Sequence, residues 1–167
     1  MTRAAATRRP LALAAFAALA ALAVVVLAGC SPAVQAELKT YDGINAIRRQ
    51  NGLPPLQPDP GLVAVARVRS ADMAAKGYFS HQPPDGCNFV CLMDRMGVPH
   101  AYAGENIAWN NWPWDQTADR AVLMWKNSPP HLENILNCHY ERFGTGVAQA
   151  ADGRIYYTMI FDGNANC

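Results

Sequence analysis

Hydrophobic residues recur at helical spacing in several parts of the chain. From residue 34 an apolar residue returns every three or four positions, and Asn51-Gly52 predicts a left-handed end to this first helix. Asp59-Pro60 predicts the start of a second helix that ends at Gly77. Shorter helices are predicted at about 88–96 and 116–127.

The stretch from Trp125 to Leu136 predicts the end of one helix and the start of the next. Ser128 is the expected N-cap, with a hydroxyl that accepts from backbone N–H groups of the first turn. Two prolines follow, where a missing N–H costs nothing. His131 then lies in the first turn, where the positive end of the helix dipole disfavours the imidazolium. A neutral imidazole there can accept a proton or bind a metal, although a single histidine in such a place is more often structural.

The C-terminal part of the chain predicts a β-hairpin. Two β-like runs, 144–150 and 154–161, are joined by Asp152-Gly153, which predicts a two-residue turn. An unbroken register would place Cys138 opposite Cys167, unless Gly144 and Gly146 mark a bulge. With an extended segment at 102–111, the predicted elements indicate an α+β fold in which helices cover a small antiparallel sheet.

The first 29 residues have the pattern of a lipoprotein signal peptide. Three arginines precede an uncharged apolar run at 11–28. Leu27-Ala28-Gly29-Cys30 resembles the bacterial lipobox, in which the cysteine becomes the lipidated first residue. We therefore expect cleavage before Cys30, a lipidated tether over 30–33, and an exported protein anchored to the outer face of the cell membrane. A transmembrane anchor is the alternative, because the apolar run is just long enough to span a membrane. The export route, Sec or Tat, stays open.

Charge and cysteine content narrow the classes of function. All 13 acidic residues but only 11 of the 14 basic ones follow residue 29, so the mature charge of about −2 gives no case for nucleic-acid binding. Four cysteines besides Cys30 in an oxidising compartment favour disulfides. We expect Cys138–Cys167 and Cys87–Cys91, with a Cys–His metal site as the alternative.

Three ionisable residues are candidates for chemistry. His81 lies in a Pro-rich loop, after the aromatic pair Tyr78 and Phe79 that we expect to plug the core. Glu105 follows a glycine in the extended segment, and His131 begins a helix. Two imidazoles and a carboxylate can hold a divalent metal such as Zn²⁺ weakly, with water in the open positions. No H-E-x-x-H pair is present, and Ser80 is a poor partner for its neighbour His81, so no nucleophile is identified.

Four motifs in order resemble the CAP superfamily, the domain of cysteine-rich secretory proteins, antigen 5 and pathogenesis-related 1 proteins, and its bacterial SCP-type branch in particular. They are Gly77-Tyr78-Phe79-Ser80-His81, Gly104-Glu105-Asn106-Ile107, Trp125 to His131, and Gly144-Thr145-Gly146-Val147.

The CAP resemblance implies a three-layer α-β-α sandwich over 34–167 and a cleft with two His and two Glu. His81, Glu105 and His131 match three of these four residues. The second Glu of many eukaryotic members falls at Ser128, so the set is incomplete. Glu133 lies on a different helix face and does not replace it.

Trp109, Trp112 and Trp114 lie close together in the sequence. They predict either an exposed aromatic lip that binds a lipid, sterol or glycan, or a cap on the core. The sequence therefore favours a CAP-domain lipoprotein that binds a lipid, sterol or cell-envelope ligand. The alternatives are a metal-assisted hydrolase in which Glu105 activates water, with His81 and His131 as the other catalytic candidates, and a structural envelope protein with a vestigial cleft.

Overall fold

The structure is a computed structural model that describes residues 31–165 and 167. The chain divides into two units, and the fold described here is that of the second unit, Pro32–Cys167. The predicted signal peptide and Cys30 lie outside the described residues. Within the described part of the chain, no helix combines the length and the apolar character needed to span a membrane.

Five helices and four strands form this second unit, close to the positions predicted from the sequence. In chain order they are α2 (Pro32–Gln50), β1 (Gln57–Pro58), α3 (Pro60–Lys76), α4 (Phe89–Arg95), β2 (Tyr102–Asn110), α5 (Thr117–Lys126), α6 (Pro129–Leu136), β3 (Tyr140–Gln149) and β4 (Ile155–Gly163). Helix α2 begins at Pro32, so Pro32 and Ala33, which the sequence assigned to the tether, form its first turn.

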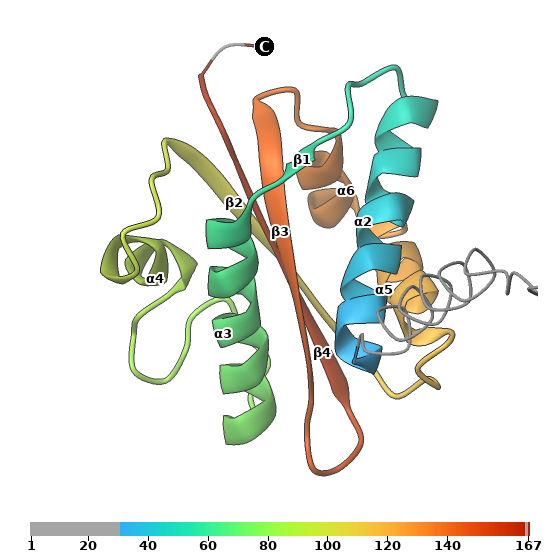
Figure 1. Ribbon diagram of the computed structural model, residues 1–167, viewed down its shortest axis with the longest axis vertical. Coiled ribbons are helices and arrows are strands. Elements are labelled where there is room, and N and C mark those ends of the chain that lie inside the picture. The colour runs from blue at the N-terminus through green and yellow to red at the C-terminus, as the bar shows by residue number, and fades with distance from the viewer. Residues whose placement is uncertain (1–30, 166) are drawn as a thin grey trace, which may run out of the picture. The chain divides into compact units, whose positions relative to one another are not determined.

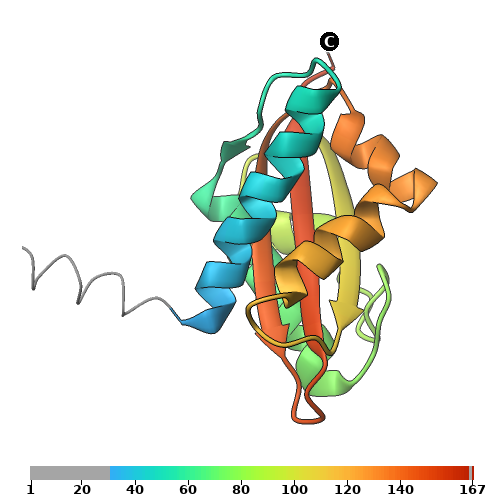
Figure 2. The ribbon, with the colours of Figure 1, turned by 90° about the vertical axis from the view of Figure 1, so that its right-hand side faces the viewer.

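The elements build three layers, as predicted. The sheet has the order β1-β3-β4-β2 and lies between α3 and α4 on one face and α2, α5 and α6 on the other (Figure 1). Figure 2 looks onto the face covered by α2, α5 and α6. The three long strands are antiparallel, but the two-residue β1 pairs parallel to β3, so the sheet is mixed and not purely antiparallel.

Two glycines of β3 allow α3 to lie directly on the sheet. A Cβ atom at Gly144 would lie 2.1 Å from the backbone nitrogen of Val63, and one at Gly146 would lie 2.2 Å from the carbonyl carbon of Ala66. The suggestion that these glycines mark a bulge is wrong. The register shift lies between Tyr140 and Arg142 instead.

The hairpin turn is longer than predicted. Gln149 pairs with Ile155, and the N–H of Ala150 donates to the carbonyl of Arg154 at 2.8 Å. This leaves a three-residue loop in which Gly153 has a φ of 88°, the left-handed conformation that such loops need. The two-residue turn, and the register derived from it, are therefore wrong.

The structure nevertheless pairs the cysteines as predicted. Cys138–Cys167 and Cys87–Cys91 both form disulfides, each with its Cα atoms 5.2 Å apart. Cys138 precedes β3 and Cys167 follows β4, so the strand ladder does not fix their register.

Ser128 occupies the N-cap position of α6 with an extended backbone, but its side chain makes no capping hydrogen bond. The predicted bond is therefore absent. An N-cap side chain accepts from the second or third N–H of a helix; Pro130 in the second position has none, which leaves the His131 N–H in the third position as the remaining donor.

Candidate functional site

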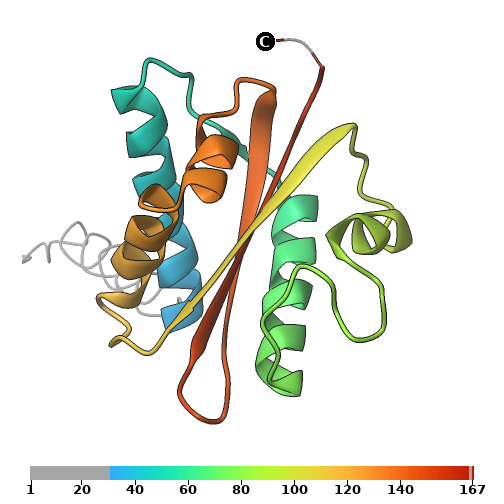
Figure 3. The same ribbon diagram turned by 180° about the vertical axis from the view of Figure 1, so that it is seen from behind.

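The predicted site residues gather at β2, the edge strand that crosses in front of the sheet in Figure 3. Successive residues of a strand point to opposite faces. Glu105 therefore faces α3, and its carboxylate contacts Arg69 of that helix. Asn106 faces α6, where its side-chain amide donates to the backbone carbonyl of His131 at 2.9 Å. We call His81, Glu105 and His131, together with Arg69, the edge site.

Glu105 is the centre of the edge site. Its side chain is only 1% exposed, and both carboxylate oxygens have partners. Oε1 accepts from Nε of Arg69 at 2.9 Å, and Oε2 lies 2.6 Å from Nδ1 of His81. The His81 side chain is 51% exposed. A carboxylate on Nδ1 fixes the orientation of the ring and leaves Nε2 free for another partner.

Arg69 holds both Glu105 and the loop that carries His81. Its guanidinium donates to the Tyr78 hydroxyl at 2.9 Å and to the backbone carbonyl of Ser80 at 2.8 Å. Burial lowers the pKa of Arg69, but the hydrogen bond to Glu105 and the negative charge there outweigh this effect, so the pKa lies above its usual value.

Sequence reasoning missed the functional role of Arg69. Helical spacing places Arg69 on the same face of α3 as the apolar residues Leu62, Val65 and Met73. A signal was present, because an arginine is almost never fully buried unless it is paired. Its carboxylate partner, 36 residues away, is not visible from helical periodicity.

The two aromatics before His81 do not both enter the core. Phe79 is 44% exposed, so the prediction that it plugs the core is wrong. Tyr78 is half-buried, and its hydroxyl donates to Asp72 at 2.6 Å. Burial, followed by the hydrogen bond to Asp72, raises the pKa of Tyr78 to about 12.

His131 is the third residue of α6, in the first turn as predicted. Burial, and then the positive charge of His81, lower its pKa below the usual value. The sequence argument predicted a lowered pKa from the helix dipole. The direction is the same, but burial and the charge of His81 cause the shift. The Nδ1 atom of His131 is buried and has no hydrogen-bond partner among the described residues.

The edge site does not bring three ligand atoms tightly together. Among the described residues, the one group of three potential ligand atoms within 4.8 Å of one another is that of Cys138, His139 and Cys167. Both of these cysteines belong to one disulfide and offer no thiolate, so we assign the group to the disulfide and not to the alternative Cys–His metal site. Ser128, the N-cap residue of α6, stands at the position where the CAP resemblance implies a second Glu.

The three tryptophans of the predicted lip divide into two groups. Trp109 is 38% and Trp112 is 43% exposed. The guanidinium of Arg120 lies 3.9 Å from the Trp112 ring centre, and that of Arg154 lies 5.6 Å from the Trp109 ring centre. Trp114 is half-buried and packs against the main core between the sheet and α2, α5 and α6.

The structure is a three-layer sandwich in which His81, Glu105 and His131 lie at the edge strand β2. The family model described as "CAP: Cysteine-rich secretory protein family" matches residues 41–161, so this chain belongs to that family. The resemblance stated from the sequence is therefore confirmed.

Three proteins similar to this chain come from bacteria. The chain is 38% identical to YkwD of Bacillus subtilis (strain 168), over 68% of this chain and 43% of that protein. It is 36% identical to the membrane protein YlbC of the same organism, over 75% of this chain and 34% of that protein. An extracellular protein of Bacillus anthracis with an SCP domain has a TM-score of 0.69 and 30% identity, over 79% of this chain and 41% of that chain. The match thus covers less than half of the length of each of these relatives.

Proposed function

We propose that this chain is an exported CAP-domain lipoprotein, anchored through Cys30, that binds a lipid, sterol or other cell-envelope ligand. The observation that carries the proposal is the engagement of both Glu105 oxygens, one by Arg69 and one by His81. A carboxylate held in this way orients a histidine, and it is poorly placed to take a proton from water. The edge site therefore favours binding over hydrolysis.

The residues fit a weakly bound divalent ion. His81 keeps Nε2 available because Glu105 occupies Nδ1, and the lowered pKa of His131 favours the neutral imidazole that a metal needs. These two histidines would hold the ion, while Glu105 would orient the His81 ring through its contact with Nδ1. This assignment differs from the sequence prediction, in which Glu105 is a ligand. A bound ion would act there as a Lewis acid toward a ligand oxygen.

Calorimetry with Zn²⁺ on metal-stripped protein tests the metal proposal. We expect binding that is lost when His81→Ala and His131→Ala are combined. Glu105→Gln should retain weaker binding, reduced by about 10- to 100-fold, because an orienting partner is removed and not a ligand. His100→Ala is the matched control, since that ring contacts Val98 and Asp94 outside the edge site. Unchanged binding in the double variant would remove the metal proposal.

The exposed pair Trp109 and Trp112 is the proposed ligand lip. Native mass spectrometry and lipidomics of protein purified from its own envelope should find a bound envelope molecule in the native chain. Combined Trp109→Ala and Trp112→Ala should lose that molecule without loss of fold. Retention of the ligand by this variant would exclude the lip as its binding surface.

The intact mass of the protein tests the proposed lipid anchor at Cys30. The intact mass of the mature protein should correspond to a chain that begins at an acylated Cys30, and Cys30→Ala should abolish the acylated form. An unprocessed N-terminus would instead favour a transmembrane anchor.

A screen of peptide and ester substrates separates this proposal from the hydrolase alternative. We expect no turnover by the native chain. A turnover that Glu105→Gln abolishes would establish the enzyme and overturn the binding proposal.

A further inference from the structure

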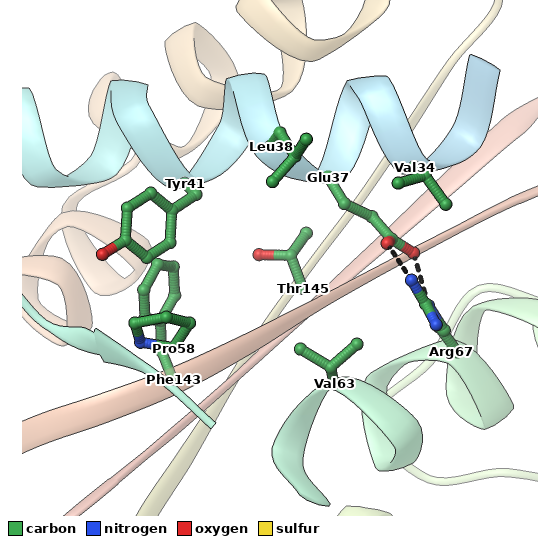
Figure 4. A pocket seen from close by; sticks show the side chains of 9 residues that line it. All are labelled: Val34, Glu37, Leu38, Tyr41, Pro58, Val63, Arg67, Phe143 and Thr145. Atoms are coloured by element: carbon green, nitrogen blue, oxygen red, sulfur yellow. Dashed lines mark hydrogen bonds and ion pairs between the residues drawn. The ribbon is translucent and has the colours of Figure 1, made fainter. Parts of the chain in front are cut away.

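A pocket lies at the sheet edge opposite to the edge site, between α2 and α3. Strand β1 pairs with β3 at two positions only, Arg142 and Phe143, so it leaves most of that edge of β3 uncovered. The pocket in this gap has a cavity volume of about 170 Å³ (Figure 4). Its lining residues come from α2, β1, α3 and β3: Val34, Glu37, Leu38, Tyr41, Pro58, Val63, Arg67, Phe143 and Thr145.

The walls of this pocket are mostly apolar and its charges are already paired. The Tyr41 ring stacks on Phe143 with 4.9 Å between ring centres. At the other end, Arg67 donates to both carboxylate oxygens of Glu37, at 2.9 and 2.6 Å. Glu37 also accepts from the backbone N–H of Val147 at 3.3 Å. A charged ligand would have to break this pairing, so the pocket favours a neutral one.

One polar group in the pocket lacks a partner. Thr145 is 4% exposed, and its hydroxyl oxygen is buried without a hydrogen bond to any described residue. Figure 4 shows the Thr145 side chain among the other lining residues, in the space between α2 and α3. Buried hydroxyl groups are normally hydrogen-bonded, so an unpaired one on a residue that lines a pocket indicates where a ligand atom would bind.

We propose that this pocket binds a neutral, ring-sized apolar molecule that carries one hydroxyl or carbonyl group, with the Thr145 hydroxyl as its hydrogen-bond partner. An apolar cavity of roughly 150 Å³ accommodates benzene, so the size fits a single ring. The ring would lie against Tyr41, Leu38 and Val63. The site is independent of the edge site, because β2 and β3 lie on opposite sides of β4.

Phenol and toluene are matched probes, since they have the same ring and differ in the hydroxyl group. Methyl NMR spectra of the full-length chain, titrated with each probe, should show phenol-dependent shifts at Leu38, Val63 and Thr145. Thr145→Val keeps the volume and removes the hydroxyl. It should weaken phenol binding by about five- to tenfold and leave toluene binding equal or stronger.

Two exposed positions provide a steric test with its control. Leu38 lines the pocket and Val68 does not, and they are 58% and 42% exposed, so either tolerates a larger side chain without disturbing the core. Leu38→Trp should weaken both probes, and Val68→Trp should weaken neither. Phenol binding should also persist when His81→Ala and His131→Ala are combined, which separates this pocket from the proposed metal site.

Three results would overturn the proposal. The first is native protein that binds toluene but not phenol, or binds neither. The second is Thr145→Val with unchanged phenol affinity. The third is phenol-dependent shifts confined to the edge site or to the exposed tryptophans.

Discussion

Arg69 and Glu105 form an ion pair, 2.9 Å from Nε to Oε1, in which each side chain is only 1% exposed. A buried charge that loses its partner is much more costly than an exposed one. Arg69→Met should therefore destabilise the protein by about 3–5 kcal/mol, measured as the free energy of unfolding in urea. Combining Arg69→Met with Glu105→Gln should cost clearly less than the sum of the two single changes, because no unpaired charge remains.

Arg67 supplies the control for this experiment. It pairs with Glu37 of α2, whose side chain is 10% exposed, but the Arg67 side chain itself is 51% exposed. Arg67→Met should cost clearly less than Arg69→Met, since the solvent around the Arg67 guanidinium screens this pair. Equal losses from Arg67→Met and Arg69→Met, or strict additivity at the buried pair, would argue against this account.

The lowered pKa of His131 predicts a loss of stability in mild acid. Below the usual pKa of 6.5 the unfolded chain binds a proton at this residue, while the folded chain resists it. The stabilising contribution is therefore fully present above pH 6.5 and declines as the pH falls toward the folded-state pKa. Urea midpoints between pH 7.5 and 5 should fall more steeply for the native chain than for His131→Gln, with EDTA present throughout.

NMR titration of the His131 ring tests the cause of this shift directly. The midpoint should lie below 6.5 in the native chain and should rise in His81→Asn, because the second source of the shift is the charge of His81. A His131 titration midpoint that is unchanged in His81→Asn would show that the two rings do not interact.

The sequence predicts the helices well because their end signals are local. The helix α3 begins after Asp59 and ends at Gly77, as expected; Asp59 accepts from the backbone N–H of Leu62, and Gly77 has a left-handed conformation. The hairpin register was predicted wrongly because it depends on the loop length and on a bulge near Tyr140, which no short pattern encodes.

The candidate site shows the same division between local and tertiary information. The CAP motifs place His81 and Glu105 on a loop and an edge strand, and the structure brings the two side chains into contact. Their dependence on Arg69 comes from a charge buried between α3 and β2. Periodicity can only report that this position faces inward.

Gly146 should not tolerate a side chain, because the backbone of α3 lies against it. A Cβ atom there would be 2.2 Å from the backbone at both Ala66 and Arg67, and backbone atoms cannot move aside cheaply. Gly146→Ala should cost about 3 kcal/mol in the free energy of unfolding. At Gly43 the nearest atom is in the Val122 side chain at 3.0 Å, and alanine favours the helix, so Gly43→Ala should stay within about 1 kcal/mol of the native chain. The reverse order of the two would be inconsistent with the close packing of α3 on β3.

The two disulfides should differ in their contribution to stability because they close loops of different length. Cys138–Cys167 spans a sequence separation of 29, and Cys87–Cys91 a separation of 4. Loop-closure entropy predicts losses of about 3.5 and about 2 kcal/mol when each pair is replaced by alanines. Urea unfolding of the two double variants measures both values, and a larger loss at Cys87–Cys91 would contradict the entropic explanation.

Trp112 and Trp114 are two residues apart but should respond differently to truncation, which decides how many tryptophans the lip contains. Trp114 packs against the main core, so Trp114→Ala should lower the free energy of unfolding by about 2 kcal/mol through lost packing. Trp112 is 43% exposed and its ring centre lies 3.9 Å from the Arg120 guanidinium, so Trp112→Ala should cost at most about 1 kcal/mol. If urea unfolding instead gives equal losses, Trp112 is a structural residue, and the proposed lip is reduced to Trp109. If the losses differ as expected, the Trp112 side chain contributes little to the stability of the fold, and its exposed ring is available to a ligand.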